Sequence, residues 1–276
     1  MLRNRRSLGI SSPALGTRFC GNGDLLGFIR GAKQPLEGSR GPVITSYIRS
    51  ADAVDTGNPA DRGSYLEDAG YPAFLEWLAE ASQVRGLATR AARLAWDRVR
   101  ERVTGHTSTN LSASINRVLG SNRLSTHAAP LLGMGRDIPD GLLYLHGPGR
   151  SGQNGHATPG GRAPLPMLDS TWTTATSEPY FARLEERMAQ VAAAVGGRYE
   201  RNPLGLLRRV ITVHPLGGLP MAQHPNDGVV DDVGRAHGVD GLYVADGSVM
   251  PGPVGPNPAL TIAAFADRMC DHMLAS

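Results

Sequence analysis

The segment HPLGG at residues 214–218 opens the most informative part of this chain, its last quarter. Residues 242–245 are apolar and end at an Asp-Gly-Ser turn, and a helix is predicted to begin just after Asn257 and Pro258. A strand end that faces a helix N-terminus is a place where a polar cofactor group can bind backbone N–H groups. His214 and Asn257 beside it could handle a proton and an alcohol oxygen. The stretches that complete this pattern are GVVD (228–231), GLYVADGS (241–248) and GPNPALTIAA (255–264).

In order and spacing, these segments resemble the C-terminal signature of the glucose-methanol-choline (GMC) flavoprotein oxidoreductases, and most of all the sterol-oxidising branch, the cholesterol oxidases. Residues 19–24 (FCGNGD) and 41–45 (GPVIT) are similar to interior parts of that family. The resemblance is weaker between about residues 87 and 162. It implies an α/β (α+β) flavoprotein, in which part of a GMC-type FAD-binding domain is interleaved with a substrate domain of a sheet and covering helices.

The resemblance also implies two units. Residues 1–205 are expected to form mainly the substrate-binding, steroid-binding-like domain, with a loop-rich stretch near 147–166. Residues 206–276 are expected to form the C-terminal part of the FAD-binding domain. The only G-x-G-x-x-G, at 147–152, is followed by Gly and Pro rather than by an amphipathic helix, so we interpret it as a surface loop. The first nucleotide-binding segment of the family therefore has no convincing copy in this sequence.

In the family that the chain resembles, a His and an Asn near the flavin ring manage the hydroxyl that is oxidised. The resemblance carries these roles to His214 and Asn257. Asn before Pro is also a common way to enter a helix, so a purely capping role for Asn257 remains open. The expected cofactor is FAD, and the residues expected to bind it are Asp246, Gly247, Asn257, Pro258, Ala259 and Thr261.

The implied reaction is oxidation of the CH–OH group of a secondary alcohol, a 3β-hydroxysteroid such as cholesterol or another hydrophobic alcohol. FAD would accept the hydride and molecular oxygen would be the final acceptor. The sterol branch also uses a carboxylate to move a proton during double-bond isomerisation, and Glu67 falls roughly where that residue would be. The alternative for Glu67 is a solvated pair with Asp68 at a turn.

A rival hypothesis concerns the chain as a whole. A truncated or split GMC product would bind no FAD and catalyse nothing alone, and it would act only with a separate chain that supplies the missing FAD-binding segment. A visible spectrum of the purified protein separates the two hypotheses.

The composition limits the other classes of function. With 41% apolar and 19% charged residues and a net charge of +3, the chain should bury a core and has no basic stripe for nucleic acid. Cys20 and Cys270 are isolated thiols, and the histidines lack metal-ligand spacing, so we expect neither a disulfide nor a metal site. Without a signal peptide or membrane span the expected location is cytoplasmic, although secretion of a longer parent stays open.

Periodicity predicts the regular elements. A basic amphipathic helix at 87–103 would allow at most peripheral contact with a membrane. The segment 104–140 carries little signal. Strands are predicted at 24–30, 43–48, 63–70, 210–213 and 242–245, and further helices at 73–82, 178–195, 204–209 and 259–274.

Overall fold

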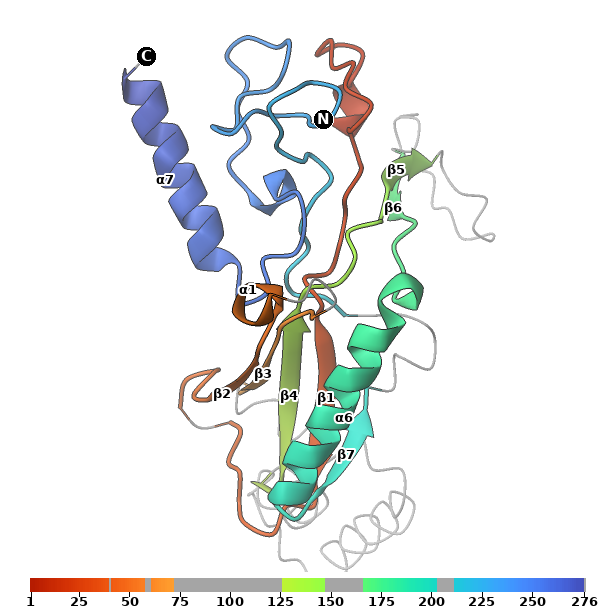
Figure 1. Ribbon diagram of the computed structural model, residues 1–276, viewed down its shortest axis with the longest axis vertical. Helices are drawn as coiled ribbons and strands as arrows, with labels where there is room; N and C mark the ends of the chain where they lie inside the picture. Colours follow the sequence, from red (N-terminus) through yellow and green to blue (C-terminus); the bar gives the residue numbers. More distant parts are fainter. Residues whose placement is uncertain (40, 58–60, 72–125, 147–165, 203–210, 276) are drawn as a thin grey trace, which may run out of the picture.

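The structure is a computed structural model that describes residues 1–39, 41–57, 61–71, 126–146, 166–202 and 211–275 (Figure 1). Its main element is an antiparallel sheet of five strands in the order β2-β3-β4-β1-β7. The strands are β1 (Leu25–Arg30), β2 (Tyr47–Ser50), β3 (Ser64–Asp68), β4 (Ala128–Gly135) and β7 (Arg198–Arg201). A separate hairpin-like pair contains β5 (Leu143–His146) and β6 (Met167–Ser170).

Helix α6 (Glu178–Ala194) covers one face of the five-stranded sheet (Figure 1). Pro179 lies in the first turn, where a backbone N–H would have no partner within the helix, so its missing N–H favours a helix start. Phe181, Leu184 and Met188 are buried at helical spacing against the sheet. A Cβ on Gly133 of β4 would lie 2.5 Å from a methyl carbon of Leu184, so glycine is required for this close packing. Burial of each large apolar side chain contributes about 1.5–3 kcal/mol.

Alternation along β3 separates the two faces of the sheet. Leu66 belongs to the core under α6, so the next residue, Glu67, points to the opposite face. The register pairs Glu67 with Tyr47 of β2 and with Leu132 of β4, which in turn pairs with Leu26 of β1. Glu67 therefore lies in a row of otherwise uncharged, largely apolar side chains on the face away from α6.

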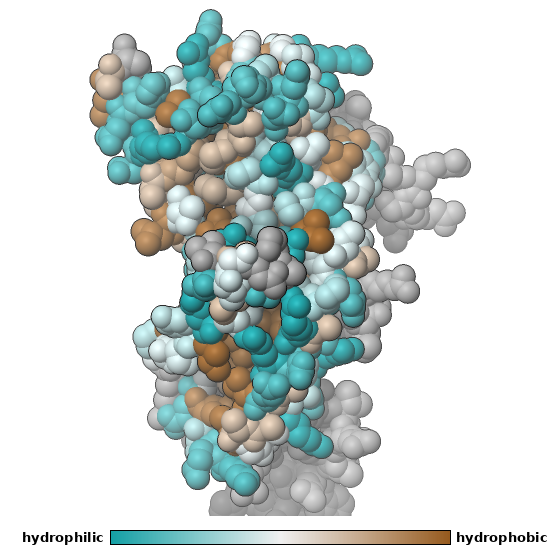
Figure 2. Space-filling model, viewed as in Figure 1, coloured by the Kyte–Doolittle hydropathy of each residue, from teal (hydrophilic) through white to brown (hydrophobic). Residues whose placement is uncertain are grey.

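A hollow on the α6 side of the sheet is lined in part by Ile48, Leu66 and Val191. Figure 2 shows it as part of a hydrophobic strip beside α6. Glu67 does not share this surface, because its side chain is directed to the other face.

The C-terminal part of the chain is mostly irregular, apart from α7 (Ala259–Ala275) (Figure 1). A second core of Leu216, Val230, Val249 and Phe265 holds it together. The beginning of the chain packs onto this part, because Ile10 and neighbouring apolar residues bury against Val229. The remaining short elements are η1 (Leu2–Asn4), α1 (Ala53–Thr56), η3 (Ala175–Ser177) and η5 (Gly247–Val249).

The expected fold class, a mixture of sheet and helices, is confirmed. The strands expected at 24–30 and 63–70 and the helices expected at 178–195 and 259–274 are present as β1, β3, α6 and α7. Strand β4 was not predicted, although it occupies the centre of the sheet. The predicted helices 73–82, 87–103 and 204–209, the Gly-rich run 147–152 and most of the loop-rich stretch lie outside the described residues.

Three predicted strands need correction. The strand expected at 43–48 begins only at Tyr47, because the Asp68 carboxylate accepts the backbone N–H groups of Thr45 and Ser46 at 2.9 and 2.6 Å. No strand forms at 211–213, where the N–H of Val213 donates to the Asp24 carboxylate instead of a neighbouring strand. Residues 242–245 contribute one isolated bridge, from Tyr243 to Arg235. None of the helices in the described ranges is long and apolar enough to cross a membrane.

Candidate active site

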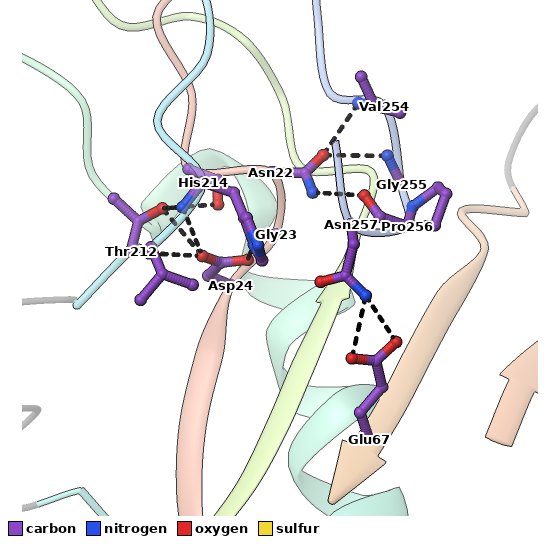
Figure 3. Close-up of polar contacts among 12 residues, drawn as sticks. Asn22, Gly23, Asp24, Glu67, Thr212, His214, Val254, Gly255, Pro256 and Asn257 are labelled. Atoms are coloured by element: carbon purple, nitrogen blue, oxygen red, sulfur yellow. Dashed lines mark hydrogen bonds and ion pairs between the residues drawn. The ribbon is translucent and has the colours of Figure 1, made fainter. Parts of the chain in front are cut away.

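A tight turn, Asn22–Gly23–Asp24, leads into β1 and lies at the centre of the candidate site (Figure 3). Asn22 and Gly23 adopt positive φ angles of 53° and 66°. Asparagine and glycine tolerate this left-handed region better than other residues. A Cβ at position 23 would lie 2.5 Å from the hydroxyl of Tyr180, so the close approach to α6 also requires glycine.

His214 contacts the side chain of Asp24 (Figure 3). Its Nδ1 lies 2.9 Å from Oδ1 of Asp24, whose side chain is completely buried. The other carboxylate oxygen accepts the backbone N–H groups of Val213 and His214 at 2.8 and 3.1 Å. An ionised carboxylate can only accept, so a neutral imidazole that bonds to it would carry its proton on Nδ1 and leave Nε2 as an acceptor. The imidazole is 16% exposed, enough for a reactant to approach it.

Asn257 contacts Glu67. Its side-chain nitrogen donates to both carboxylate oxygens of Glu67, at 3.0 and 3.1 Å (Figure 3). Glu67 is only 5% exposed, so the alternative of a solvated Glu-Asp pair is wrong. An amide NH₂ group has two donors, and the second remains available to an oxygen of a bound reactant.

Asn22 holds the loop that carries Asn257. Its side-chain oxygen accepts the N–H groups of Val254 and Gly255, both at 2.9 Å, and its amide nitrogen donates to the carbonyl of Pro256 at 3.0 Å. The same turn thus contacts the His214 segment through Asp24 and the Asn257 loop through Asn22 (Figure 3). Segments that are far apart in sequence, including Glu67 of β3, are brought together at this end of the sheet.

Gly247, one of the residues expected to bind FAD, lies beside the His214 segment. The N–H of Gly217 donates to the carbonyl of Gly247 at 3.1 Å, which joins the two Gly-rich stretches. Asp246 is exposed, and its carboxylate accepts the N–H of Ser248 at 2.8 Å. The Ser248 hydroxyl is buried and has no hydrogen-bond partner within the described part of the chain.

The start of α7 is open to solvent. The first α-helical bond runs from the N–H of Ile262 to the carbonyl of Pro258 at 2.9 Å. The N–H groups of Ala259, Leu260 and Thr261 therefore have no carbonyl partner within the helix, and all three residues are exposed. Free donors at a helix N-terminus suit an electron-rich polar edge such as a flavin carbonyl. The residues present thus fit the ring end of FAD.

A third buried carboxylate, Asp137, contacts Gly21, the residue directly before the turn. Its Oδ2 accepts the N–H of Gly21 at 3.0 Å, whereas Oδ1 has no hydrogen-bond partner among the described residues. Burial raises the pKa of Asp137 to about 6. Burial, together with the charge of Asp137, raises the pKa of the neighbouring Cys20 thiol to about 12.

Sequence reasoning missed Asn22 and Asp24 as site residues. The segment FCGNGD was recognised as part of the resemblance, but nothing in it singled out these two side chains. The Asp24–His214 contact spans 190 positions, and the Asn22–Pro256 contact spans 234. The available signal was a short polar, Gly-containing turn directly before an apolar strand.

The fold of this chain is similar to the crystal structure of pyridoxine 4-oxidase from Mesorbium loti, with a TM-score of 0.50 and 18% identity, over 96% of this chain and 44% of that chain. At this identity the likeness concerns the fold alone. Residues 173–266 match the family model described as GMC oxidoreductase, so this part of the chain is similar to the C-terminal region of that family.

Curated relatives match over short spans. An uncharacterised GMC-type oxidoreductase of Sinorhizobium fredii is 41% identical over 24% of this chain and 13% of its own length. A cholesterol oxidase of Acinetobacter baumannii is 42% identical over 23% of this chain and 12% of its own length. A paromamine 6'-oxidase of Streptomyces fradiae is 37% identical over 32% of this chain and 16% of its own length. The named substrates differ, so the matched region carries features common to the family.

Proposed function

We propose that this chain contributes the catalytic end of an FAD-dependent oxidoreductase that acts on the CH–OH group of a secondary alcohol, with molecular oxygen as the acceptor. The observation that carries the proposal is the pairing of His214 with buried Asp24 beside a loop that presents Asn257. FAD, when bound, would accept the hydride from the alcohol carbon.

The side chains divide the remaining work. His214, with its proton on Nδ1, can accept the hydroxyl proton at Nε2. Asn257 can donate its second amide hydrogen to the substrate oxygen while the first stays with Glu67. Ala259 and Thr261, together with Asn257 and Pro258, would hold the ring end of the cofactor. Asp246 and Gly247 would hold its pyrophosphate or ribityl chain.

We propose a hydrophobic alcohol, a 3β-hydroxysteroid, as the substrate. The row on the sheet face around Glu67 supports this choice, because Leu26, Leu132 and Tyr47 offer mostly apolar surface next to the carboxylate. A ring system that lies along this row would place a hydroxyl near Asn257 and an adjacent ring carbon near Glu67. Glu67 is then the proposed base for double-bond isomerisation. Residues 1–205 and 206–276 are the proposed substrate and cofactor units.

The first experiment is a visible spectrum of the purified protein before and after addition of FAD. Flavin absorption that stays with the protein through gel filtration supports the enzyme. A protein that remains colourless favours the alternative of a split or truncated chain, and the same titration should then be repeated with candidate FAD-binding partner chains.

The second experiment replaces His214 with Asn in the flavin-bound protein. An Asn side chain can still donate to Asp24, but its amide has no basic nitrogen in place of Nε2. We expect unchanged flavin content and a kcat lower by about 10²–10⁴-fold, the usual contribution of a general base. His224→Asn is the matched control, because His224 is exposed. Equal kcat values in the native protein and His214→Asn would reject the assigned role.

A third experiment tests Glu67. In Glu67→Gln the side-chain oxygen can still accept from Asn257, but the base is lost. We expect 3β-hydroxysteroid oxidation to continue and the double bond of the ketone product to stay in place. Product analysis by chromatography distinguishes the isomers. Normal isomerisation by Glu67→Gln would remove Glu67 from this role.

A further inference from the structure

We propose that the turn Asn22–Gly23–Asp24 positions both reactive side chains, with Asp24 fixing the tautomer of His214 and Asn22 fixing the loop that carries Asn257. The catalytic consequence rests on the proposed function. The proton position and the loop geometry, in contrast, are properties of this chain and can be measured without a cofactor or substrate.

The Asp24 carboxylate holds the His214 segment through several hydrogen bonds, which we call the Asp24 arm of the turn. Oδ1 faces Nδ1 of His214, and Oδ2 faces the N–H groups of Val213 and His214 and the hydroxyl of Thr212, at 2.8–3.1 Å. The side chain has no exposed surface, so bulk solvent does not reach the carboxylate. A carboxylate held in this way accepts only, which selects the Nδ1–H form of the imidazole. Nε2 is then the nitrogen able to receive a proton.

The hydrogen bonds of the Asn22 side chain to the loop before Asn257 form the Asn22 arm of the turn. They require an amide, which carries both a donor and an acceptor. Two backbone N–H groups, of Val254 and Gly255, donate to its oxygen, and its nitrogen donates to Pro256. These three bonds define the path of the chain directly before Asn257. Neither aspartate nor leucine at position 22 could make all three, because aspartate lacks the donor and leucine lacks both groups.

The turn that carries both arms is itself hydrogen-bonded to β4 and α6. The carbonyl of Asn22 accepts the N–H of Gly135 at the end of β4, at 2.9 Å. The carbonyl of Gly23 accepts the hydroxyl of Tyr180 from α6, at 3.0 Å. The turn is therefore joined to the central strand and to the buried face of the helix. Any displacement of the turn would move His214 and Asn257 together.

Nitrogen-15 NMR of the histidine side chains tests the Asp24 arm directly. With ¹⁵N-histidine labelling, the His214 signal is assigned by its loss in His214→Asn. At pH values high enough for the imidazole to be neutral, we expect the Nδ1–H tautomer. In Asp24→Asn, the new amide can donate to Nδ1, so we expect a shift to Nε2–H. The control Asp240→Asn, at a 97% exposed carboxylate, should leave the signal unchanged.

The native spectrum is decisive even if Asp24→Asn does not fold. A His214 imidazole that is mainly Nε2–H in the native protein would overturn the Asp24 arm. A tautomer that stays Nδ1–H in folded Asp24→Asn would also overturn it.

The Asn22 arm is tested by Asn22→Asp, which keeps the size of the side chain and tolerates the positive φ. It loses the donor to Pro256. We expect the side-chain amide signals of Asn257, assigned by their loss in Asn257→Asp, to shift or broaden. The exposed residue Asn226 provides the matched control Asn226→Asp, which should not affect them. Unchanged Asn257 signals in Asn22→Asp would overturn this arm.

The catalytic consequence is measured separately in the flavin-bound protein. A histidine forced into the wrong tautomer by an Asp-to-Asn change loses up to about 10⁴-fold in kcat in the Ser-His-Asp triad. We expect Asp24→Asn to lose about 10²–10⁴-fold in kcat, with unchanged flavin content and with a changed pH profile of kcat. If the tautomer switches but turnover does not change, the proposed function fails while the positioning inference stands.

Discussion

The sheet with α6 and the C-terminal part with α7 are stabilised in different ways. The first is built from continuous hydrogen-bonded strand pairs and one apolar cluster under α6. The second has few regular elements, and individual side chains such as Asn22 and Asp24 fix its backbone. The two candidate catalytic residues that the GMC signature carries, His214 and Asn257, both lie in the irregular part. The site therefore depends on specific polar contacts and glycines more than on regular secondary structure.

The largest expected effect is at Gly217, in the irregular part. Its φ is 84°, and a Cβ there would overlap the carbonyl oxygen of Arg18. We expect Gly217→Ala to lower the free energy of unfolding by about 4 kcal/mol, from the left-handed backbone and the overlap together. Urea unfolding measures this change. Gly238→Ala is the control, since φ is 74° there but the space is open, and it should cost about 1 kcal/mol. Equal costs at the two positions would show that the irregular part is loosely packed.

The next effect concerns the regular part. Leu184 is 1% exposed and packs onto Gly133, so Leu184→Ala should lower the free energy of unfolding by about 3 kcal/mol. The control Leu274→Ala, at a residue that is 88% exposed, should change little. A ¹⁵N spectrum of folded Leu184→Ala should keep the native His214 tautomer. A changed tautomer would mean that packing under α6 also determines the geometry of the irregular part.

A smaller, pH-dependent effect on the free energy of unfolding is expected from Asp137, which contacts the residue before the Asn22–Gly23–Asp24 turn. The pKa of its carboxyl in the folded protein is about 6, above the ordinary value of 3.8, because burial disfavours the charged form. The folded state therefore holds this proton more tightly than the unfolded state, and the native protein loses stability as pH rises from about 4 to 6. Relative to Asp137→Asn, whose side chain does not titrate, this loss should approach about 3 kcal/mol at most.

Urea unfolding of both proteins at several pH values checks this prediction. The free energy of unfolding of Asp137→Asn should increase relative to that of the native protein as pH rises from 4 to 7. The two free energies should differ least at acid pH. Replacement of Oδ1 by NH₂ loses no hydrogen bond, because this oxygen has no partner among the described residues. A stability difference that is independent of pH would contradict the raised pKa.

The smallest effect is expected at the surface ion pair of Arg235 with Asp240. The two side chains are 51% and 97% exposed, so water and salt screen their attraction. Arg235→Gln should change the free energy of unfolding by at most about 0.5 kcal/mol. A larger loss in thermal unfolding would show that isolated charges add more to the irregular part than its hydrogen bonds imply.

Sequence patterns anticipated the elements whose signal is local. The 3.6-residue period identified α6 and α7, and the apolar run after Asp24 identified β1. Strand β4 has a Pro and two Gly residues, which depress strand propensity, and its place in the sheet comes from pairing with β1 and β3. Propensity along the chain does not register such long-range pairing.

The site residues also differ in how much local sequence signal they carry. His214 and Asn257 stand in recognisable motifs, whereas no pattern in the sequence predicted the hydrogen bond between Asn257 and Glu67. Asp24 carries no comparable local signal, because its importance arises only when a segment 190 residues away folds onto it. The apolar residues at 211–213 predicted a strand, but the N–H of Val213 donates to the same carboxylate and not to a neighbouring strand.

The burial of Cys20 has a practical consequence for spectroscopy. A thiol with a pKa near 12 and no exposed surface stays protonated and unreactive towards maleimides at neutral pH, whereas Cys270 on α7 is exposed. Since the chain contains two cysteines, a fluorophore or spin label should attach to α7 alone, without mutagenesis. The helix whose first turn adjoins the site thus provides a natural reporter of ligand arrival.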